Sequence, residues 1–328
     1  MTRKVLGFII GAVQQFLLGT VFFLLVGACS SRKHEVDQTE IGFGSYFRIC
    51  GRGKKADEVR KTVRRAFAEM HRLDTLWSNF VEKSEVVRLN RARTIPVSAE
   101  TRNLIEKAIA LGAATGGAFD ITVEPLVRLW GFYDHSYRLP ESSELKNLLR
   151  RVDYHQVTVR GDTVVLGDGV NLDLGGVAVG YAVDRIVEIL LSGGLSEGLV
   201  DAGGDIRVFG DRVWRIGIKH PRREGMIRVL KLKNRAVSTS GDYEKFFEIG
   251  GRRYCHIIDP KTGYPVSHWV AVTVIAPSAL EADAYATALF VLGDKGVEFL
   301  PALPGVGALF FEVRDNSVVG KEVGLVDE

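Results

Sequence analysis

The stretch GYAVDRIVEILLSGGLSEGLVDAGGDIRVFG, residues 180–210, places a helix directly before a run of strands. Residues 180–193 predict a helix that Gly193 can close, because glycine is favoured just past a helix end. Strands are predicted at 199–210, at 213–220 (VWRIGIKH) and at 227–233 (IRVLKLK), without helices between them. A doubly wound sheet would need regular strand–helix alternation. The pattern therefore predicts an α+β fold, a single large domain with a mixed sheet and packed helices.

The segments on either side supply the other elements. A strand is predicted at 40–50 and a helix at 56–77, where apolar residues recur at helical spacing. Ser98 is a suitable N-cap for a helix at 98–115, and a short helix is predicted at 141–152. Towards the C-terminus, a helix is predicted at 279–293 and a buried strand at 306–313.

Composition excludes several classes of protein. The chain has 328 residues, of which 46% are hydrophobic and 25% are charged, and its formal net charge is +3. These values are ordinary for a globular protein and exclude a disordered chain or a polytopic membrane protein. Because no long basic run is present, no nucleic-acid partner is expected.

The N-terminus predicts an address outside the cytoplasm. Arg3 and Lys4 precede an apolar run, which ends in Val26-Gly27-Ala28-Cys29 and resembles the bacterial lipobox. We expect a signal peptide at 1–28, lipidation of Cys29, a polar tether at 29–39 and the functional domain at 40–328. The protein would then be lipid-anchored to a bacterial cell membrane and face the periplasm. The alternative is a transmembrane anchor, since the apolar run is long enough to span a bilayer.

Two further cysteines, Cys50 and Cys255, remain in the mature chain. They could pair in an oxidising compartment, and unpaired buried thiols are an equally good interpretation. The sequence leaves both open.

Common nucleotide and hydrolase motifs are absent. The chain has no P-loop, no complete dinucleotide fingerprint, and no CxxC or HExxH metal pattern. The segment GLSEG around Ser196 follows a helix and precedes a strand, which is the wrong order for a nucleophile elbow.

Asp283 and Thr287 are the first candidates for a metal site. At positions i and i+4 of a helix they share one face, so both oxygens could reach one hard cation such as Mg²⁺. The alternative is purely structural. An acid in the first turn interacts favourably with the helix dipole, and the Thr287 hydroxyl could donate a hydrogen bond to the carbonyl of Asp283.

The segment HIIDPKTGYP, residues 256–265, sets a histidine before a turn. Asp259 and Gly263 suit the turn itself, and Ile257 and Ile258 predict the end of a buried strand. On this segment alone, His256 is more readily interpreted as a packed residue than as a catalyst.

Six segments taken together resemble the ApbE-type flavin transferase family. In chain order they are TGGAFDITVEPLVRLWGF, DLGGVAVGYAVD, DAGGDIRVFG, STSGDYEKFF, HIIDPKTGYPV and EADAYATALFVLG. The resemblance extends from about Gly42 to Leu309. It implies an α+β enzyme, often a lipoprotein, that needs Mg²⁺ and cleaves FAD. FMN would pass to a Thr or Ser of a target protein with release of AMP, and typical acceptors are subunits of redox-driven membrane ion pumps.

The resemblance also implies roles for individual residues. Asp283, Thr287 and the carbonyl of Gly176 would bind Mg²⁺, and His256 would be a general base beside the pyrophosphate. Ala286 stands where some members have an acid, and Val179 where Lys or Glu is common. The residues expected to contact FAD are Phe43, Ala118, Phe119, Asp120, Asp173, Ser240 and Ile258.

Asn79 marks a possible departure from the family. The segment LWSNFVEKSEVVRLN matches a family stretch with a tyrosine that falls at Asn79 or Phe80, depending on a one-residue slip. We place Asn79 in the cleft, because Phe80 runs into apolar Val81 and could belong to the core. An asparagine cannot stack on an FAD ring, so we expect a wetter site that also hydrolyses FAD to FMN and AMP.

Two other functions compete with this interpretation. One is a flavin-binding or flavin-storage lipoprotein without catalysis, and the other is a general nucleotide pyrophosphatase. A cation site at Asp283 and Thr287 favours an enzyme over a storage protein, since binding alone does not need one.

Overall fold

The structure is a computed structural model that describes residues 34–325. These residues belong to one compact unit. The predicted signal peptide at 1–28, the lipidation site Cys29 and the first part of the predicted tether lie outside the described residues.

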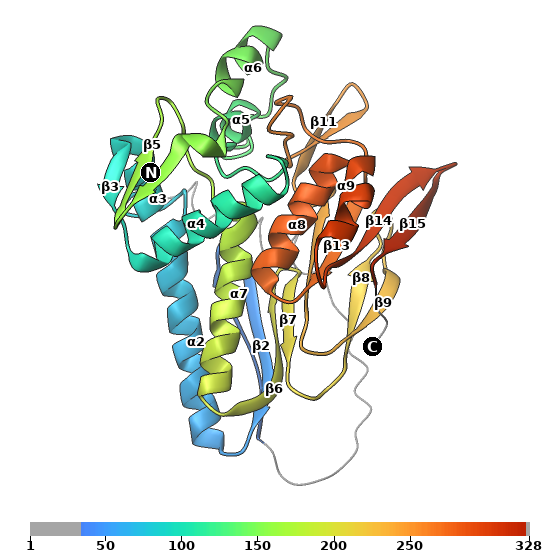
Figure 1. Cartoon of the computed structure of the whole chain (residues 1–328). Coiled ribbons are helices and arrows are strands. Elements are labelled where there is room, and N and C mark those ends of the chain that lie inside the picture. Colours follow the sequence, from blue (N-terminus) through green and yellow to red (C-terminus); the bar gives the residue numbers. More distant parts are fainter. Residues whose placement is uncertain (1–33, 326–328) are drawn as a thin grey trace, which may run out of the picture. The chain divides into compact units, whose positions relative to one another are not determined.

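One eight-stranded sheet organises the domain (Figure 1). Its neighbours all pair antiparallel. The α+β class and the single domain are thus confirmed, but the sheet is antiparallel and not mixed, because its strands are joined mainly by hairpins and by crossovers that reverse direction. In spatial order the strands are β1 (His34–Gly42), β2 (Ser45–Gly53), β6 (Leu195–Ala202), β7 (Asp205–Phe209), β10 (Ala236–Gly241), β13 (Ala271–Ala276), β14 (Gly307–Arg314) and β15 (Ser317–Val323).

The first hairpin corrects two sequence predictions. The predicted strand at 40–50 is two strands, because the chain reverses at Phe43 and Gly44, where φ is 53° and 72°. A phenylalanine at positive φ is unusual, which is why the turn left no sequence signal. The predicted tether at 29–39 is also too long: residues 34–39 pair with β2 as part of β1.

Helices α2 (Ala56–Trp77), α7 (Gly175–Ser192) and α8 (Ala279–Leu292) cover one face of the sheet, and α4 (Ala99–Ala114) packs on α7. Alternate strand residues point to this layer, as Ala236 of β10 and Phe310 of β14 do. Ser98 caps α4 and Gly193 ends α7, as predicted. Helix α8 is buried almost all round, which is typical of a helix inside a core.

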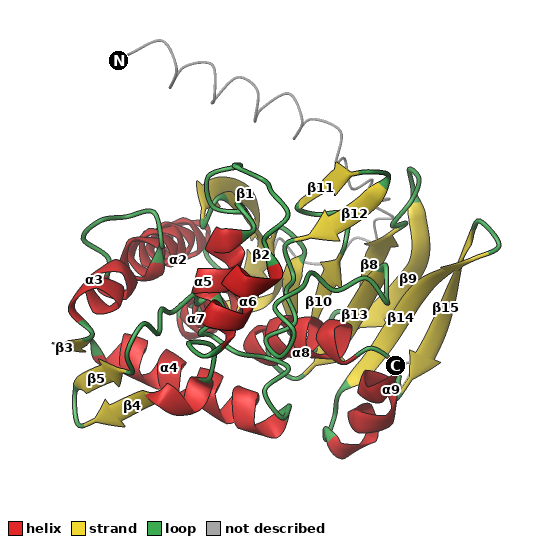
Figure 2. Ribbon diagram, turned by 90° about the horizontal axis from the view of Figure 1, so that it is seen from above, coloured by secondary structure: helices red, strands yellow, loops and turns green. Residues whose placement is uncertain are grey.

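The opposite face of the sheet carries a smaller hairpin, β8 (Trp214–Lys219) and β9 (Met226–Leu232). Figure 2 shows this hairpin on one side of the sheet and α8 on the other. Val237 of β10 and Leu309 of β14 point towards the hairpin, where Trp214, Ile216 and Leu230 meet them in a second apolar cluster.

A third cluster lies near the top of Figure 1, between α5 (Glu124–Leu129), α6 (Ser142–Leu149) and the hairpin β11 (Phe246–Ile249) to β12 (Arg252–Cys255). Its centre is aromatic. The ring of Phe247 stacks on Tyr137 at 4.9 Å and on Tyr254 at 5.2 Å, and Trp130 stacks on Tyr254 at 5.6 Å. Such contacts fix the hairpin on the helices.

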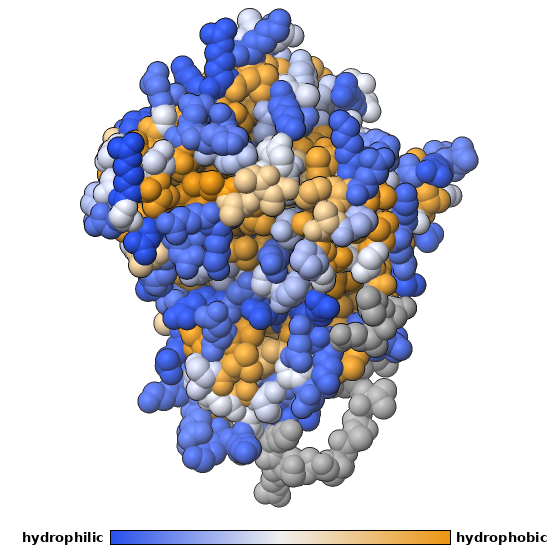
Figure 3. Space-filling model, viewed as in Figure 1, coloured by the Kyte–Doolittle hydropathy of each residue, from blue (hydrophilic) through white to orange (hydrophobic). Residues whose placement is uncertain are grey.

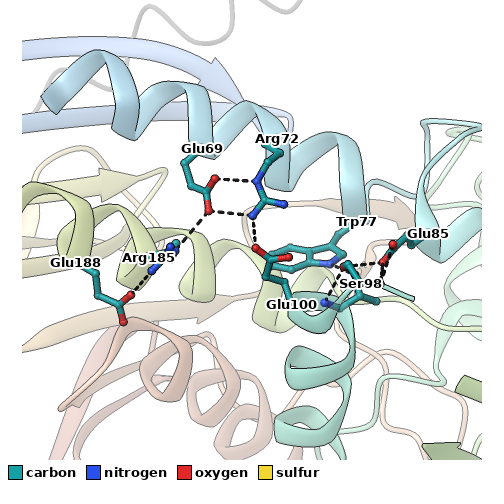
Figure 4. Close-up of polar contacts among 9 residues, drawn as sticks. Glu69, Arg72, Trp77, Glu85, Ser98, Glu100, Arg185 and Glu188 are labelled. Carbon is teal, nitrogen blue, oxygen red and sulfur yellow. Dashed lines mark hydrogen bonds and ion pairs between the residues drawn. The ribbon is translucent and has the colours of Figure 1, made fainter. Parts of the chain in front are cut away.

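Polar contacts join the helices at their surface (Figure 4). Arg72 of α2 binds Glu69 on its own helix and Glu100 of α4, at 2.8 and 2.6 Å. Beneath them Trp77 donates to the hydroxyl of Thr101 at 2.8 Å. These contacts fix α2 against α4. They do not involve the ends of α7 and α8, which form the site.

The remaining elements are peripheral to the site. They are α3 (Glu85–Ala92), β3 (Thr94–Pro96), η1 (Tyr154–Gln156), β4 (Val157–Arg160), β5 (Thr163–Leu166), α9 (Asp294–Phe299) and η2 (Leu300–Ala302). Figure 3 shows hydrophobic residues in orange between hydrophilic ones on the helical side, whereas the projecting end of β14–β15 is hydrophilic. No helix among residues 34–325 is long and apolar enough to cross a bilayer. Cys50 and Cys255 are both free thiols.

Candidate active site

The crossing of α7 and α8 brings a carboxylate to the backbone of α7. Gly180 makes this close approach possible, because a Cβ there would lie 2.5 Å from the carbonyl oxygen of Ala279. The amide of Gly180 donates to Oδ2 of Asp283 at 3.3 Å. Asp283 is buried, and no Lys or Arg pairs with it in the described part of the chain. Burial raises the pKa of its carboxyl well above the usual range, and the nearby Asp205 raises it further.

Thr287 and Gly176 lie one helical turn further along this crossing. The Thr287 hydroxyl is 3.3 Å from that of Ser240 on β10. A Cβ at Gly176 would stand 3.8 Å from the Thr287 hydroxyl and 3.2 Å from the ring of Phe119. Four of the predicted site residues therefore meet here: Gly176, Thr287, Ser240 and Phe119.

These residues fit a hard divalent cation. Their donors are all oxygens, and the buried Asp283 carboxylate is stabilised by little besides one long amide hydrogen bond. Within residues 34–325 no three His, Cys, Asp or Glu side chains gather to hold a metal. A cation would therefore be bound by Asp283 together with neighbouring hydroxyl and carbonyl oxygens.

A second carboxylate, the half-buried Asp205 at the start of β7, was not predicted from the sequence. It accepts a hydrogen bond from the hydroxyl of Ser238 at 2.5 Å, and burial raises its pKa. Its segment, DAGGDIRVFG, predicts only a strand and a turn. The proximity to Asp283 arises because β7 packs beneath α8, which local sequence does not reveal.

Asp173, just before α7, is the centre of a hydrogen-bond network. Its Oδ1 accepts from the Asn79 side-chain amide at 3.1 Å and from the backbone amide of Gly175 at 2.8 Å. Its Oδ2 accepts from the Tyr133 hydroxyl at 2.6 Å. Burial and the Asp173 charge raise the pKa of Tyr133 well above its usual value, so this phenol stays protonated and donates.

The choice between Asn79 and Phe80 can now be described in space. Asn79 faces Asp173 and Tyr133, at the start of α7. The prediction that Phe80 could belong to the core is wrong: its side chain is 76% exposed and touches the Tyr133 ring edge-on at 5.8 Å. The tyrosine that contacts Asp173 is Tyr133. Its segment, WGFYDHS, contains no motif that predicts a site residue.

Ala118 and Asp120 flank Phe119 and are buried. The Asp120 carboxylate accepts from the amide and hydroxyl of Thr122 at 2.8 and 2.6 Å, and from the amide of Tyr154 at 3.0 Å. The Asp120 carboxylate therefore stabilises the local fold through these three hydrogen bonds. A contact of Asp120 with FAD stays a prediction.

Phe43 and Ile258 belong to different apolar clusters. The Phe43 ring is part-buried against the main core, 5.7 Å from the ring of Phe47. Ile258 is buried in the aromatic cluster under α5 and α6. Their contact with a flavin stays a prediction.

His256 follows β12 and is held by its backbone and its ring. Its Nδ1 lies 3.2 Å from the carbonyl oxygen of Lys245, so Nδ1 carries the proton and Nε2 has the free lone pair. Burial, with the nearby Lys245 charge, lowers the pKa of the imidazole to about 4. Its ring meets that of Phe132, next to Tyr133, at 6.4 Å. Asp259 fixes the following turn, as expected, through the amide of Lys261 and the hydroxyl of Thr262.

Comparison with known proteins decides the family. The sequence model of the ApbE family matches residues 43–310. The chain belongs to the ApbE family. A Treponema pallidum protein named FAD:protein FMN transferase is 34% identical over 332 residues, which cover 92% of this chain and 91% of the relative. The Escherichia coli K12 protein of the same name is 33% identical, with 77% of each chain covered.

Solved structures of ApbE proteins share the fold. The ApbE protein of Thermotoga maritima has a TM-score of 0.80 and 36% identity, covering 84% of this chain and 94% of its own. The apo flavinyl transferase ApbE of Pseudomonas stutzeri has a TM-score of 0.81 and 32% identity, covering 89% and 95%.

Two departures from the usual ApbE pattern fall on packed residues. Ala286 is fully buried among the residues of the main core, and Val179 packs against the same core. Neither side chain brings a polar atom to the crossing of α7 and α8. Asp205 is the further acid close to Asp283 in this ApbE protein.

Proposed function

We propose that this ApbE protein transfers FMN from FAD to a Thr or Ser hydroxyl of an acceptor protein and releases AMP. The observation that carries the proposal is the buried Asp283 carboxylate at the α7–α8 crossing, next to Thr287 and Gly176. A buried carboxylate without a cationic partner is costly, and a bound Mg²⁺ would remove that cost. The names of the relatives support the transferase reaction.

Asp283, Thr287 and the carbonyl of Gly176 would hold the Mg²⁺. When bound, the cation supplies positive charge that neutralises charge growing on the phosphoryl oxygens. Asp173 is restrained just before α7 by Asn79 and Tyr133, so the wall of the site is fixed before substrate arrives.

His256 would act as the base in the transfer. The acceptor oxygen bonds to the phosphorus of FMN, and the bond from this phosphorus to the oxygen shared with AMP breaks. The hydroxyl proton passes to Nε2 of His256, and the electron pair of the broken bond leaves with AMP. With the pKa of His256 near 4, Nε2 is free to accept at neutral pH.

Hydrolysis of FAD to FMN and AMP is the second part of the proposal. Asn79 presents an amide towards Asp173, where an aromatic ring would exclude water. Water can then replace the acceptor hydroxyl in the same displacement. Transfer and hydrolysis would share the cation site and differ in the nucleophile.

Purified protein, FAD and MgCl₂ test the proposal when the products are separated by chromatography. FMN and AMP should form in equal amounts, and chelation should stop their formation. Intact FAD in the presence of Mg²⁺, with FAD nevertheless bound, would instead favour a storage protein. Cleavage of NAD or ADP-ribose at a similar rate would favour a general pyrophosphatase.

We also propose that Cys29 is lipidated, that the domain faces the periplasm, and that the acceptor is a subunit of a redox-driven membrane pump. The lipobox-like Val26-Gly27-Ala28-Cys29 supports the first two statements. A Cys29→Ala variant should stay unprocessed or leave the membrane fraction. Processing and fractionation like the wild type would contradict lipidation.

A further inference from the structure

The hairpin β8–β9 carries a concentration of positive charge. Residues 211–235 contain nine Lys and Arg and two acids, a net +7, whereas the whole chain has +3. The cations are spaced out by apolar residues, so the sequence shows no basic run. The fold collects them on one hairpin.

Strand alternation decides which side chains face outwards. Trp214, Ile216 and Ile218 of β8 pack into the second apolar cluster, together with Leu230 and Leu232 of β9. The intervening Arg215 and Lys231 therefore point away from the sheet. They are directly opposite each other in the ladder, an arrangement of like charges that costs stability.

Several of these cations have no partner in the protein. Arg228 pairs with Glu322, Arg222 with Asp242, and Lys233 with Asp211. For the side chains of Arg215, Arg223 and Lys231, by contrast, residues 34–325 provide no ion pair and no hydrogen bond. An anionic partner outside the domain would reduce the repulsion among these unpaired cations.

Apolar side chains lie between these cations. Val213, Met226 and Val229 are 48%, 58% and 38% exposed. Gly217 is opposite Val229 in the ladder, and the Met226 thioether lies over Gly217. The outer face thus combines exposed apolar groups with cations, which suits the boundary between lipid headgroups and acyl chains.

The hairpin also begins at the end of the sheet where the chain enters the domain. His34 is paired with Gly53, and Gly53 with Leu195, whereas the turn at Phe43 is at the far end of β1. Phe209 lies towards the same end as Leu195, and Gly210 bonds to Asn234 just after β9. Arg212 and Lys233 therefore lie at the same end of the sheet as His34, the first described residue, and the start of α7 lies towards the other end (Figure 1).

We propose that the outer face of β8–β9 docks on anionic lipid headgroups of the membrane. The cavities of about 540 and 450 Å³ are lined by other elements, and a cationic surface is complementary to anionic headgroups. Docking would act together with the lipid anchor proposed at Cys29. It would hold the active site away from the bilayer, open to an acceptor.

Vesicle sedimentation tests the docking, with the domain that begins after Cys29 and contains all three apolar clusters. The domain should sediment with vesicles of phosphatidylcholine and phosphatidylglycerol at low salt, and should remain in solution with phosphatidylcholine alone or at high salt. Replacing Arg215, Arg223 and Lys231 together by Gln should weaken binding about 100-fold, or about fivefold for each charge. A matched control replaces Lys61, Arg64 and Arg65 of α2 by Gln and should bind like the unchanged domain.

Equal binding by the two triple variants, or no binding to anionic vesicles, would overturn the proposal. A second result would also overturn it: the β8–β9 variant binds vesicles normally but, unlike the control variant, loses FMN transfer to an acceptor when no vesicles are present. The face would then bind a protein and not a membrane. FAD cleavage by each variant is measured in parallel. It should be unchanged, so that failure of docking is separable from failure of the proposed enzymatic function and from loss of the anchor at Cys29.

Discussion

The two halves of the active site are built differently. The cation half consists of Asp283, Thr287 and Gly176, held by two packed helices in the main core. The flavin half consists of Asn79, Tyr133 and His256, held by segments after α2, after α5 and after β12. In the first half the buried acid Asp283 lacks a cationic partner, whereas in the second Asn79, Tyr133 and Nδ1 of His256 each make a hydrogen bond. Under the proposed function, the cation half would require its ligand, and the flavin half would select the nucleophile.

Asp283→Asn is the strongest way to break this comparison. The variant keeps the size of the side chain and removes the charge that a cation needs. FAD cleavage should fall roughly 1,000-fold, about 4 kcal/mol in the transition state. Without Mg²⁺, the variant should unfold at the same or a higher temperature than the wild type, because a buried acid without a cationic partner has been removed.

A matched control is Asp294→Asn, an exposed acid of α9 outside the site. It should leave unchanged both the turnover of FAD and the stabilisation of the folded protein by Mg²⁺. Wild-type turnover in Asp283→Asn would remove the cation half from the account.

His256→Gln tests the chemistry of the flavin half. Removing the base should slow FMN transfer roughly 100-fold, whereas FAD and Mg²⁺ binding should be retained. Single-turnover transfer and flavin fluorescence measure the two effects separately. Loss of FAD binding in step with transfer would make His256 a packing residue, which is the alternative that its sequence favoured.

Asn79→Tyr sharpens the role of the flavin half in choosing between water and acceptor. A ring at this position should exclude water and slow FAD hydrolysis about tenfold, while transfer persists. FMN release without an acceptor is the measurement. Equal release by both proteins, or negligible release by the wild type, would contradict the role of Asn79. Phe80→Ala is a suitable control, because this exposed ring does not face Asp173.

The smallest expected effect is on stability at acid pH. The folded state holds the pKa of His256 at about 4, below the usual value of 6.5. As pH falls from 6.5 towards 4, the unfolded chain takes up a proton that the folded chain does not, so stability is lost in this window. His256→Gln should remove about 1 kcal/mol of the difference between pH 7 and pH 5. Urea unfolding at both values measures it, and an identical pH dependence in wild type and variant would contradict the lowered pKa.

The proximity of Asp283 and Thr287 was predicted from the sequence, whereas that of Tyr133 and Asp173 was not, for a physical reason. Asp283 and Thr287 share a helix face, so their proximity follows from one helical turn. Asp205 and Tyr133 reach the site only through strand packing and through the fold of the segment after α5, which no local pattern encodes.

The fold shows the same limit. Buried helices and strands were found from periodicity. The turn at Phe43 was missed because it uses positive φ without an Asn or Asp signal, and the edge strand β15 was missed because it has little apolar alternation.

The most direct test of the central claim is the intact mass of an acceptor protein after incubation with this enzyme, FAD and Mg²⁺. The account predicts a covalent gain of one FMN on a Thr or Ser, with one AMP released for each acceptor modified. It also predicts no gain with Asp283→Asn or when FMN replaces FAD. An acceptor that gains mass without Mg²⁺, or that gains it from free FMN, would contradict the account.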